Sequence, residues 1–258
     1  MVNPKDLFSL DGKTVLVTGA SSGIGAHAVQ LFSSMGAKVV LAARSAETIE
    51  LAAAEIRRGG GDALAVTLDV TDRDSVQQGV DQAVAEFGTV DVLLNNAGIA
   101  RTERFLELSE DDWQAVLDTN LSGVWRVGQV VARQMVEQQS GGSIINVSSI
   151  LGIGVQRRQA NYAAAKAAVI QLTRTMALEL GRRGVRVNAI APGYIVTGIN
   201  REFFASEKGQ AYVQSLFPGR PGNLEELDGA LLLLAGPGGS YIQGVTIPVD
   251  GGTLLGAL

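Results

Sequence analysis

Short runs rich in β-branched residues alternate along this chain with longer stretches of helical periodicity, and this alternation limits the fold more than any other feature. A strand, a helix and a second strand in succession form the unit that builds parallel sheets, because the crossover between the strands is long enough for one helix. The predicted strands are residues 14–18, 38–43, 63–68, 90–95, 142–148, 185–190 and 245–249. The sequence therefore predicts an α/β fold, a doubly wound parallel sheet of about seven strands with helices on both faces.

Three of the predicted helices have a recognisable start. Each begins with a small polar residue that is followed three positions later by an acid, which is the pattern of a capping box. The pairs are Thr71 with Asp74, Ser109 with Asp112, and Asn223 with Glu226.

No internal repeat or low-complexity linker divides the sequence, so we expect a single domain over residues 1–258. The stretch 194–221 departs from the alternation, because it mixes polar residues with apolar ones between two ends rich in Gly and Pro. Such an insertion is typical of a lid over an apolar pocket, and we expect a substrate lid there. The alternative is a helical excursion that only packs on the core.

Composition excludes several kinds of site. The chain has no Cys and one His, His27, so disulfides, thiol nucleophiles and zinc sites that need Cys or two His are excluded, and we expect no metal. The formal net charge is -5 and the basic residues are scattered, so we expect neither a nucleic acid nor a membrane as partner. The N-terminal residues show no signal-peptide pattern, and we expect a cytoplasmic protein.

The first predicted strand runs directly into the glycine cluster Gly19-Ala-Ser-Ser-Gly23-Ile-Gly25, after which a helix begins. Glycines at such a turn allow the backbone to approach a ligand, while the N–H groups at the helix start face a pyrophosphate. The spacing is G-x3-G-x-G rather than the commoner G-x-G-x-x-G. The cluster predicts a dinucleotide site of the Rossmann type, with a tight structural turn as the alternative.

Further motifs occur in a fixed order, namely Thr18-Gly-Ala-Ser-Ser-Gly-Ile-Gly25, Asn95-Asn-Ala-Gly98, Asn120, Ser149, Tyr162-Ala-Ala-Ala-Lys166 and Pro192-Gly193. Together they resemble the ~250-residue branch of the short-chain dehydrogenase/reductase family, including its 3-oxoacyl reductase and ketone reductase members, over essentially the whole chain. The resemblance implies an NAD(P)-dependent oxidoreductase acting on CH–OH and C=O groups. The cofactor-binding residues that it implies are Gly19, Ser21, Ser22, Gly23, Ile24, Gly25, Asp69, Val70, Asn96, Ala97, Gly98, Tyr162, Lys166, Pro192, Gly193, Ile195 and Thr197.

The end of the second strand bears on which nicotinamide cofactor is used. An acid there would bind the 2′-hydroxyl of NAD, but the chain has Arg44 and Ser45, which favour NADP(H) because a guanidinium can grip a 2′-phosphate. Alternatively, Arg44 is only solvated and Ser45 caps a helix. Ser22 stands where some NADP-using relatives carry a second basic residue, so NAD(H) remains the alternative cofactor. Asp69 resembles the family's adenine contact, or it only ends its strand.

Tyr162 and Lys166 lie four residues apart in an Ala-rich helical stretch, so both project from one helix face. A nearby ammonium stabilises a phenolate and lowers the phenol pKa, which lets Tyr162 exchange a proton with a substrate oxygen. The alternative is a snorkelling Lys beside a Tyr. Ser149 stands where the family has its substrate-orienting serine, with Ser148 expected on the other strand face. Asn120 resembles the family's helix-kinking Asn.

The motifs together predict an NADP(H)-dependent oxidoreductase that interconverts a ketone and a secondary alcohol, with Tyr162 as acid and base. A 3-oxoacyl thioester reductase and an NAD-dependent alcohol dehydrogenase are alternatives, and a dinucleotide-sensing regulator is the alternative without catalysis. By resemblance we expect a homotetramer, packed through the helices around 109–138 and 159–180. The expected substrate contacts are Ser149, Leu151, Gln159, Tyr162, Tyr194 and Phe203.

Overall fold

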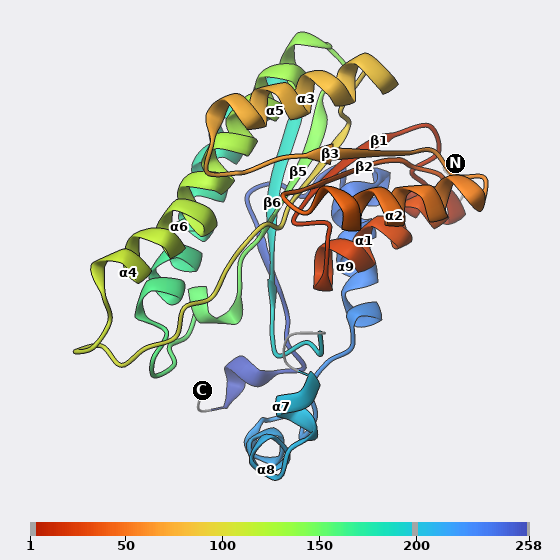
Figure 1. Cartoon of the computed structure of the whole chain (residues 1–258). Coiled ribbons are helices and arrows are strands. Elements are labelled where there is room, and N and C mark those ends of the chain that lie inside the picture. The colour runs from red at the N-terminus through yellow and green to blue at the C-terminus, as the bar shows by residue number, and fades with distance from the viewer. Residues whose placement is uncertain (1–3, 198–200, 257–258) are drawn as a thin grey trace.

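The computed structural model describes residues 4–197 and 201–256, which form one parallel sheet with helices on both faces (Figure 1). The order of its seven strands is β3-β2-β1-β4-β5-β6-β7, and every neighbouring pair is parallel. The strands are β1 (Thr14–Thr18), β2 (Lys38–Ala43), β3 (Ala63–Thr67), β4 (Val92–Asn95), β5 (Gly142–Val147), β6 (Val185–Pro192) and β7 (Thr246–Val249). All seven predicted strands are present, and only their ends differ by one or two residues.

Helices cover the sheet in two layers. One layer holds α1 (Gly23–Ser34), α2 (Ala46–Arg58) and α9 (Asp228–Ala235), and the other holds α3 (Arg73–Phe87), α5 (Val124–Glu137) and α6 (Ala160–Leu180). Successive residues of β1 alternate between the layers, because Val15 and Val17 pack with the first and Leu16 with the second. Burial on both faces explains why the strands are nearly uninterrupted apolar runs. The remaining helices are α4 (Glu110–Leu117), α7 (Arg201–Ala205) and α8 (Glu207–Ser215).

Two of the three predicted helix starts are confirmed. Ser109 accepts a hydrogen bond from the Asp112 N–H at 3.1 Å, and Asn223 forms a capping box with Glu226 at the start of a 3-10 helix. The prediction for Thr71 is wrong, because Asp72 caps α3. The Thr71 hydroxyl instead donates a hydrogen bond to the Asp69 carboxylate, and this bond takes the place of a bond to the start of the helix.

A chain of buried amides ties the middle of the sheet to α6. Asn95 on β4 donates to the side chain of Asn146 on β5 at 3.3 Å, and Asn146 donates to the Thr173 hydroxyl on α6 at 2.9 Å. All three side chains are fully buried, so breaking one bond would leave a polar group unsatisfied. These contacts fix the position of α6 over the sheet.

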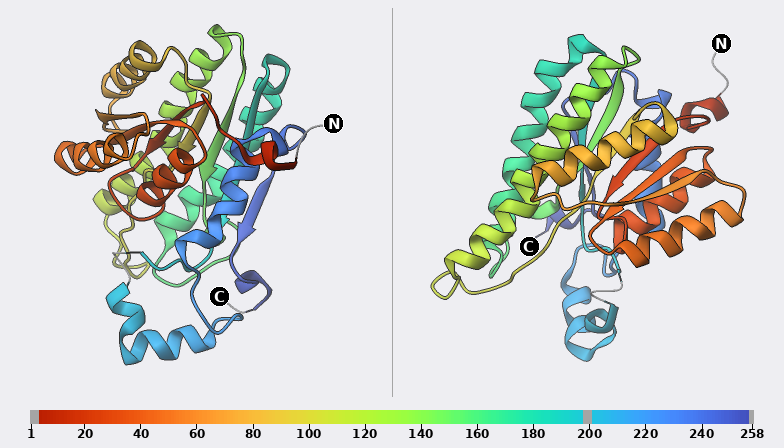
Figure 2. Two further views of the ribbon diagram at one scale, coloured as in Figure 1. Left: turned by 90° about the vertical axis from the view of Figure 1, so that its right-hand side faces the viewer. Right: turned by 45° about the horizontal axis from the view of Figure 1, so that its top comes forward.

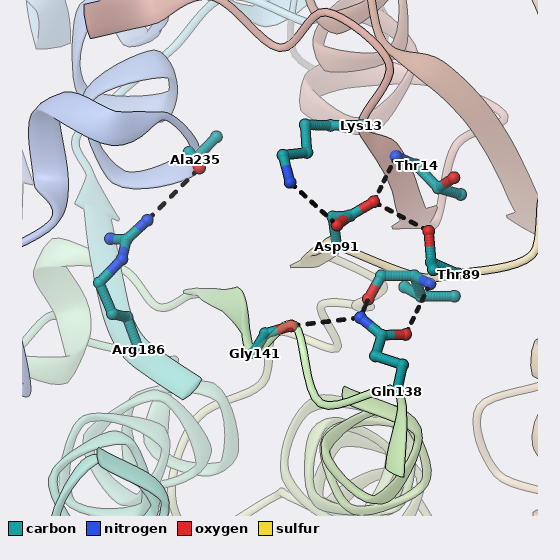
Figure 3. A network of polar contacts seen from close by, with 9 residues as sticks. Lys13, Thr14, Thr89, Asp91, Gln138, Gly141, Arg186 and Ala235 are labelled. Carbon is teal, nitrogen blue, oxygen red and sulfur yellow. Dashed lines mark hydrogen bonds and ion pairs between the residues drawn. The ribbon is translucent and has the colours of Figure 1, made fainter. Parts of the chain in front are cut away.

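At the amino edge of the sheet, polar side chains hold the strand starts together (Figure 3). Asp91 accepts hydrogen bonds from the Thr14 N–H at 2.9 Å and from Lys13 Nζ at 3.2 Å. Arg186 on β6 donates to three carbonyls at the end of α9, those of Ala235, Gly236 and Gly239. Arg186 therefore ties β6 to the last residue of α9 and to the turn that follows it.

Replacing Arg186 with methionine should lower the free energy of unfolding by about 1.5–3 kcal/mol, because a charged donor to these carbonyls is lost while the aliphatic stem remains. Urea denaturation measures this change. Arg174→Met is the matched control, because Arg174 lies exposed on α6 and, among the described residues, makes only a 3.4 Å contact with Gln171. An equal loss in both variants would contradict the assigned role of Arg186.

Candidate active site

The glycine turn after β1 lies at the carboxyl edge of the sheet, between β1 and β4, where the strand order reverses. Gly19 and Gly23 have φ values of +67° and +56°, which a residue with a Cβ rarely adopts. A Cβ on Gly25 would lie 2.3 Å from the Gly19 carbonyl oxygen, so only glycine fits there. Ser22, the residue before α1, makes no side-chain capping bond, which leaves the first N–H groups of α1 for a ligand.

Thr18 and Asn96 hold this turn against β4. The Thr18 hydroxyl accepts hydrogen bonds from the N–H groups of Asn96 at 3.0 Å and Ala97 at 3.1 Å, and Asn96 Nδ2 donates to the Thr18 carbonyl at 2.9 Å. Asn96 and Ala97 are among the predicted cofactor residues, and the structure brings them directly beneath the glycine turn. Thr18 is not among the predicted site residues, although its place immediately before the first glycine is a usable signal.

Arg44 and Asp69 lie at the ends of neighbouring strands, β2 and β3. Arg44 is exposed, and Ser45 occupies the N-cap position of α2 without a capping hydrogen bond from its side chain. Partial burial alone would raise the pKa of Asp69, but hydrogen bonds from Thr71 and the nearby charge of Arg44 hold that pKa below its usual value. Val70 is buried beside Asp69, and its carbonyl accepts from Arg126 at 3.3 Å. The exposed Arg44 guanidinium can therefore contact a ligand at the carboxyl edge of the sheet.

The sixth strand brings its carboxyl end to the same place. Pro192 ends β6, and the Gly193 N–H donates to Val249 at 3.0 Å. A Cβ on Gly23 would lie 3.5 Å from the Thr197 side chain, so Thr197 borders the glycine turn. Ile195 is buried and packs with the first helix layer. Residues from the two halves of the chain therefore meet around the turn.

Ser149, Tyr162 and Lys166 come together where β5 ends and α6 begins. The Ser149 hydroxyl is close enough to the Tyr162 phenol to influence its pKa, and Lys166 Nζ lies 5.6 Å from the centre of the Tyr162 ring. Lys166 is almost fully buried, and its ammonium donates to the Val147 carbonyl at 2.8 Å. Ser148, the neighbouring serine, points elsewhere and donates to the Lys166 carbonyl at 2.9 Å.

Burial sets the protonation of this group. It raises the pKa of Tyr162, contrary to the lowering expected from a neighbouring ammonium, although Ser149 partly offsets the rise, and it lowers the pKa of Lys166 to about 8. At neutral pH the phenol is protonated and the amine is mostly charged. This state suits a phenol that gives a proton to a carbonyl oxygen with a cation close by.

In the cofactor-free protein, Lys166 should titrate with a midpoint near pH 8, because burial disfavours its charged form. The ammonium should therefore be lost as the pH rises from about 7 to 9, well below the range of an exposed lysine. NMR of protein with lysines labelled at Cε can follow this titration, assigned with a Lys166→Met variant. Lys208, an exposed residue on α8, is the internal reference. A Lys166 midpoint above pH 10 would contradict the assignment.

Asn120 lies in a π-helical turn, Asp118–Gly123, that interrupts the helix between α4 and α5. Its side chain is fully buried and pairs twice with the backbone of Ile99, donating to the carbonyl and accepting from the N–H, both at 2.8 Å. A Cβ on Gly98 would lie 3.3 Å from Asn120 Oδ1. Single π-turns within helices are frequent at functional sites. Asn120 thus fixes the loop after β4.

Among the predicted substrate contacts, Leu151 is buried next to Ser149, and its N–H donates to the Ser149 hydroxyl at 3.1 Å. Gln159 precedes α6, and its amide oxygen is buried with no hydrogen-bond partner in the described part of the chain. Tyr194 follows β6 and lies against Tyr212 of α8. The Phe203 side chain lies outside the described residues.

One cleft lies away from this site. A cavity of about 420 Å³ opens at the amino edge, beside Lys13, Asp91 and Arg186, and one of about 160 Å³ lies next to Tyr194 and Arg220.

Within residues 4–197 and 201–256, no three acidic or histidine side chains come together as metal ligands would. No helix in the same ranges is both long and apolar enough to span a membrane.

The residues at the carboxyl edge fit a nicotinamide dinucleotide. The glycine turn has no room for a Cβ at Gly19 or Gly25, the start of α1 has no side-chain cap, and the Lys166 ammonium lies beside the Tyr162 ring. Such a turn followed by a helix start is the phosphate cradle of dinucleotide-binding sheets. Together they define a Rossmann-type dinucleotide site with a buried tyrosine and lysine at the same edge of the sheet.

Comparisons with known proteins agree with this class. Residues 13–208 match the sequence model of the short chain dehydrogenase family. The chain is 42% identical to the 3-oxoacyl-[acyl-carrier-protein] reductase FabG of Thermotoga maritima, over 95% of this chain and 99% of that protein. It is 40% identical to the gluconate 5-dehydrogenase of Gluconobacter oxydans, over 96% of each chain. The chain therefore belongs to the short-chain dehydrogenase family, and it is an NAD(P)-dependent oxidoreductase acting on CH–OH and C=O groups.

Solved structures show the same fold. A gluconate 5-dehydrogenase from Burkholderia cenocepacia, in complex with NADP and tartrate, superposes with a TM-score of 0.93 at 35% identity, covering 98% of this chain and 99% of that one. A dehydrogenase of the short-chain type from Mycobacterium marinum gives a TM-score of 0.91 at 38% identity, covering 96% of this chain and 98% of that one. The expected fold class is thus confirmed.

Proposed function

We propose that this chain interconverts a ketone and a secondary alcohol with NADP(H), and that Tyr162 is the acid and base of the reaction. The observation that carries the proposal is the grouping of Ser149, Tyr162 and Lys166 at the carboxyl edge of the sheet, the edge that also holds the glycine turn. The intact group of Asn120, Ser149, Tyr162 and Lys166 argues against a regulator that only senses the dinucleotide. A protein that only binds the dinucleotide would need Lys166 for the ribose, but it would not need a phenol that exchanges a proton with a substrate.

Each residue has a distinct part in the proposed reaction. When bound, the nicotinamide supplies a hydride to a carbonyl carbon or accepts one from an alcohol. Ser149 donates a hydrogen bond to the substrate oxygen as negative charge develops there. Tyr162 gives its proton to the same oxygen during reduction and takes it back during oxidation. Lys166 holds the ribose of the cofactor and lowers the free energy of the phenolate.

The remaining cofactor residues surround the glycine turn. We assign pyrophosphate binding to Gly19, Ser21, Ser22, Gly23, Ile24, Gly25 and Thr197, adenine binding to Asp69 and Val70, and contacts to the nicotinamide half to Asn96, Ala97, Gly98, Pro192, Gly193 and Ile195. Arg44 and Ser45 would hold the 2′-phosphate. NADP is bound in the gluconate 5-dehydrogenase from Burkholderia cenocepacia, which supports NADP(H) as the cofactor here.

Replacing Arg44 with alanine should weaken NADPH binding about 10- to 100-fold and leave NADH binding unchanged, because only NADPH has the phosphate that this charge contacts. Isothermal titration calorimetry with each cofactor measures the difference. Arg58, exposed at the end of α2, supplies the matched control Arg58→Ala. An equal loss of affinity for NADPH and NADH would mean that Arg44 attracts both cofactors by its charge and does not contact the 2′-phosphate.

The substrate class is tested by a panel of carbonyl compounds and alcohols, assayed with NADPH and NADH in parallel. The panel contains a keto-gluconate and a 3-oxoacyl thioester, because gluconate 5-dehydrogenases and 3-oxoacyl-[acyl-carrier-protein] reductases are both similar to this chain. We expect turnover of at least one ketone with NADPH and, in reverse, of the matching alcohol. Binding of NADPH without turnover of any member would favour the regulator instead.

We further propose that residues 1–258 form one catalytic domain in which 194–221 is a substrate lid, and that the protein is a cytoplasmic homotetramer. Exposed apolar side chains on the predicted interface helices support the tetramer, among them Trp113, Trp125 and Leu178. Leu151, Gln159 and Tyr194 would contact the substrate, as would Phe203. Sedimentation velocity tests the assembly, and a monomer at micromolar concentration would contradict it.

A further inference from the structure

The segment beyond β6 leaves the body of the protein and returns to it at one narrow neck. The Gly222 N–H donates to the Tyr194 carbonyl and the Val196 N–H donates to the Gly222 carbonyl, both at 2.8 Å. Between these points the chain forms α7 and α8, which project beyond the carboxyl edge of the sheet (Figures 1 and 2). Because α8 packs chiefly against α7, any contact from α8 to the body has a large influence on where it sits.

Such a contact exists at Tyr212 of α8. Its hydroxyl is hydrogen-bonded to the Tyr194 hydroxyl at the neck, and it accepts a hydrogen bond from Gln156 Nε2 at 2.9 Å. The two phenol rings meet edge to face, with their centroids 5.4 Å apart and their planes at 90°. Three segments distant in sequence are therefore joined through two hydroxyls and one amide.

The contact persists at physiological pH. Burial raises the pKa of Tyr194 well above its usual value, and the hydrogen bond with Tyr212 raises it further. The Tyr194 phenol is thus neutral, and its oxygen accepts the hydrogen bond from the Tyr212 hydroxyl. Gln156 belongs to the loop between Ser149 and α6, the same loop that begins with the serine beside Tyr162.

We propose that Gln156, Tyr194 and Tyr212 form a hydrogen-bonded clasp that positions α8 over the substrate and fixes it relative to the Ser149 loop. The clasp rests on the proposed function, and it makes Tyr212 and Gln156 positioning residues. A lid that is closed only part of the time binds substrate more weakly in proportion to the closed fraction. Loss of the clasp therefore raises KM and leaves the chemistry at Tyr162 unchanged.

The test compares Tyr212→Phe and Gln156→Leu with the wild type. Tyr212→Phe keeps the ring and removes the hydroxyl that both bonds need. It should raise KM for the ketone about 3- to 10-fold, with kcat within twofold and NADPH affinity unchanged. Deuterium uptake of peptides from 207–215 should rise, while uptake of peptides from the sheet stays constant. Tyr241→Phe is the control, because the Tyr241 side chain is fully exposed.

A double variant tests whether the residues act as one unit. Gln156→Leu combined with Tyr212→Phe should have the KM of Tyr212→Phe alone, since the shared hydroxyl is already gone. Additive effects would overturn the clasp, and so would unchanged deuterium uptake or an unchanged KM in Tyr212→Phe. A wild-type protein that reduces no ketone would contradict the proposed function instead, and the deuterium uptake of 207–215 would then decide the clasp by itself.

Discussion

Tyr162→Phe should lower kcat for ketone reduction by a factor on the order of 10²–10⁴, which is the contribution of a positioned proton donor. The phenol is the group that touches Ser149 and lies under the Lys166 ammonium, so no neighbour can replace it. NADPH affinity should change less than about threefold, because the cofactor is held mainly by the glycine turn and Lys166. Steady-state kinetics and a fluorescence titration of NADPH separate the two effects.

The matched control for this substitution is Tyr241→Phe, which removes a phenol hydroxyl from a fully exposed position. This variant should keep the wild-type kcat and NADPH affinity. Turnover by Tyr162→Phe at the wild-type rate would show that the proton donor is assigned wrongly. A simultaneous loss of NADPH binding and thermal stability would show instead that the hydroxyl holds the structure of the site.

Gly25→Ala should weaken NADPH binding about 10- to 100-fold, because the added Cβ would lie 2.3 Å from the Gly19 carbonyl oxygen and 2.6 Å from Asn96 Nδ2. Neither neighbour can move alone, since Asn96 is hydrogen-bonded to Thr18. The whole turn must shift, and with it the N–H groups at the start of α1. Calorimetric titration with NADPH measures the loss.

Gly229→Ala is the control for Gly25→Ala. Gly229 is also a helical glycine, in α9, but a Cβ there would meet no atom within 4 Å. This variant should bind NADPH normally and be more stable by about 0.5–1 kcal/mol, because alanine loses less conformational entropy on folding. Equal NADPH binding by the Gly25 and Gly229 variants would contradict the role given to the turn.

The sheet could be predicted because its signals are local. Each strand is an apolar run of β-branched residues, and burial on both faces leaves little ambiguity in such runs. The strand ends were less certain, since the predicted 90–95 and 142–148 are shorter in the structure at one end. The start of α3 was misplaced because Thr71 and Asp72 are both good caps, and the choice depends on Asp69.

The candidate site was partly predictable for a different reason. Glycines, Tyr162 and Lys166 are informative because their chemistry requires those residue types at fixed spacing. The contacts that hold them could not be predicted, because they join residues far apart in the chain, as Thr18 joins Asn96 and Tyr212 joins Gln156. The protonation of Lys166 likewise follows from burial that only the folded chain produces.

The most direct test of this account follows the hydride itself. The protein is incubated with NADPH deuterated at C4 of the nicotinamide, separately on each face, and with a ketone that it reduces, and the product is analysed by mass spectrometry. The account predicts deuterium on the carbinol carbon from one face only, at a rate that falls by a factor on the order of 10²–10⁴ in Tyr162→Phe. An alcohol without deuterium from either face, or the same rate in the variant, would contradict it.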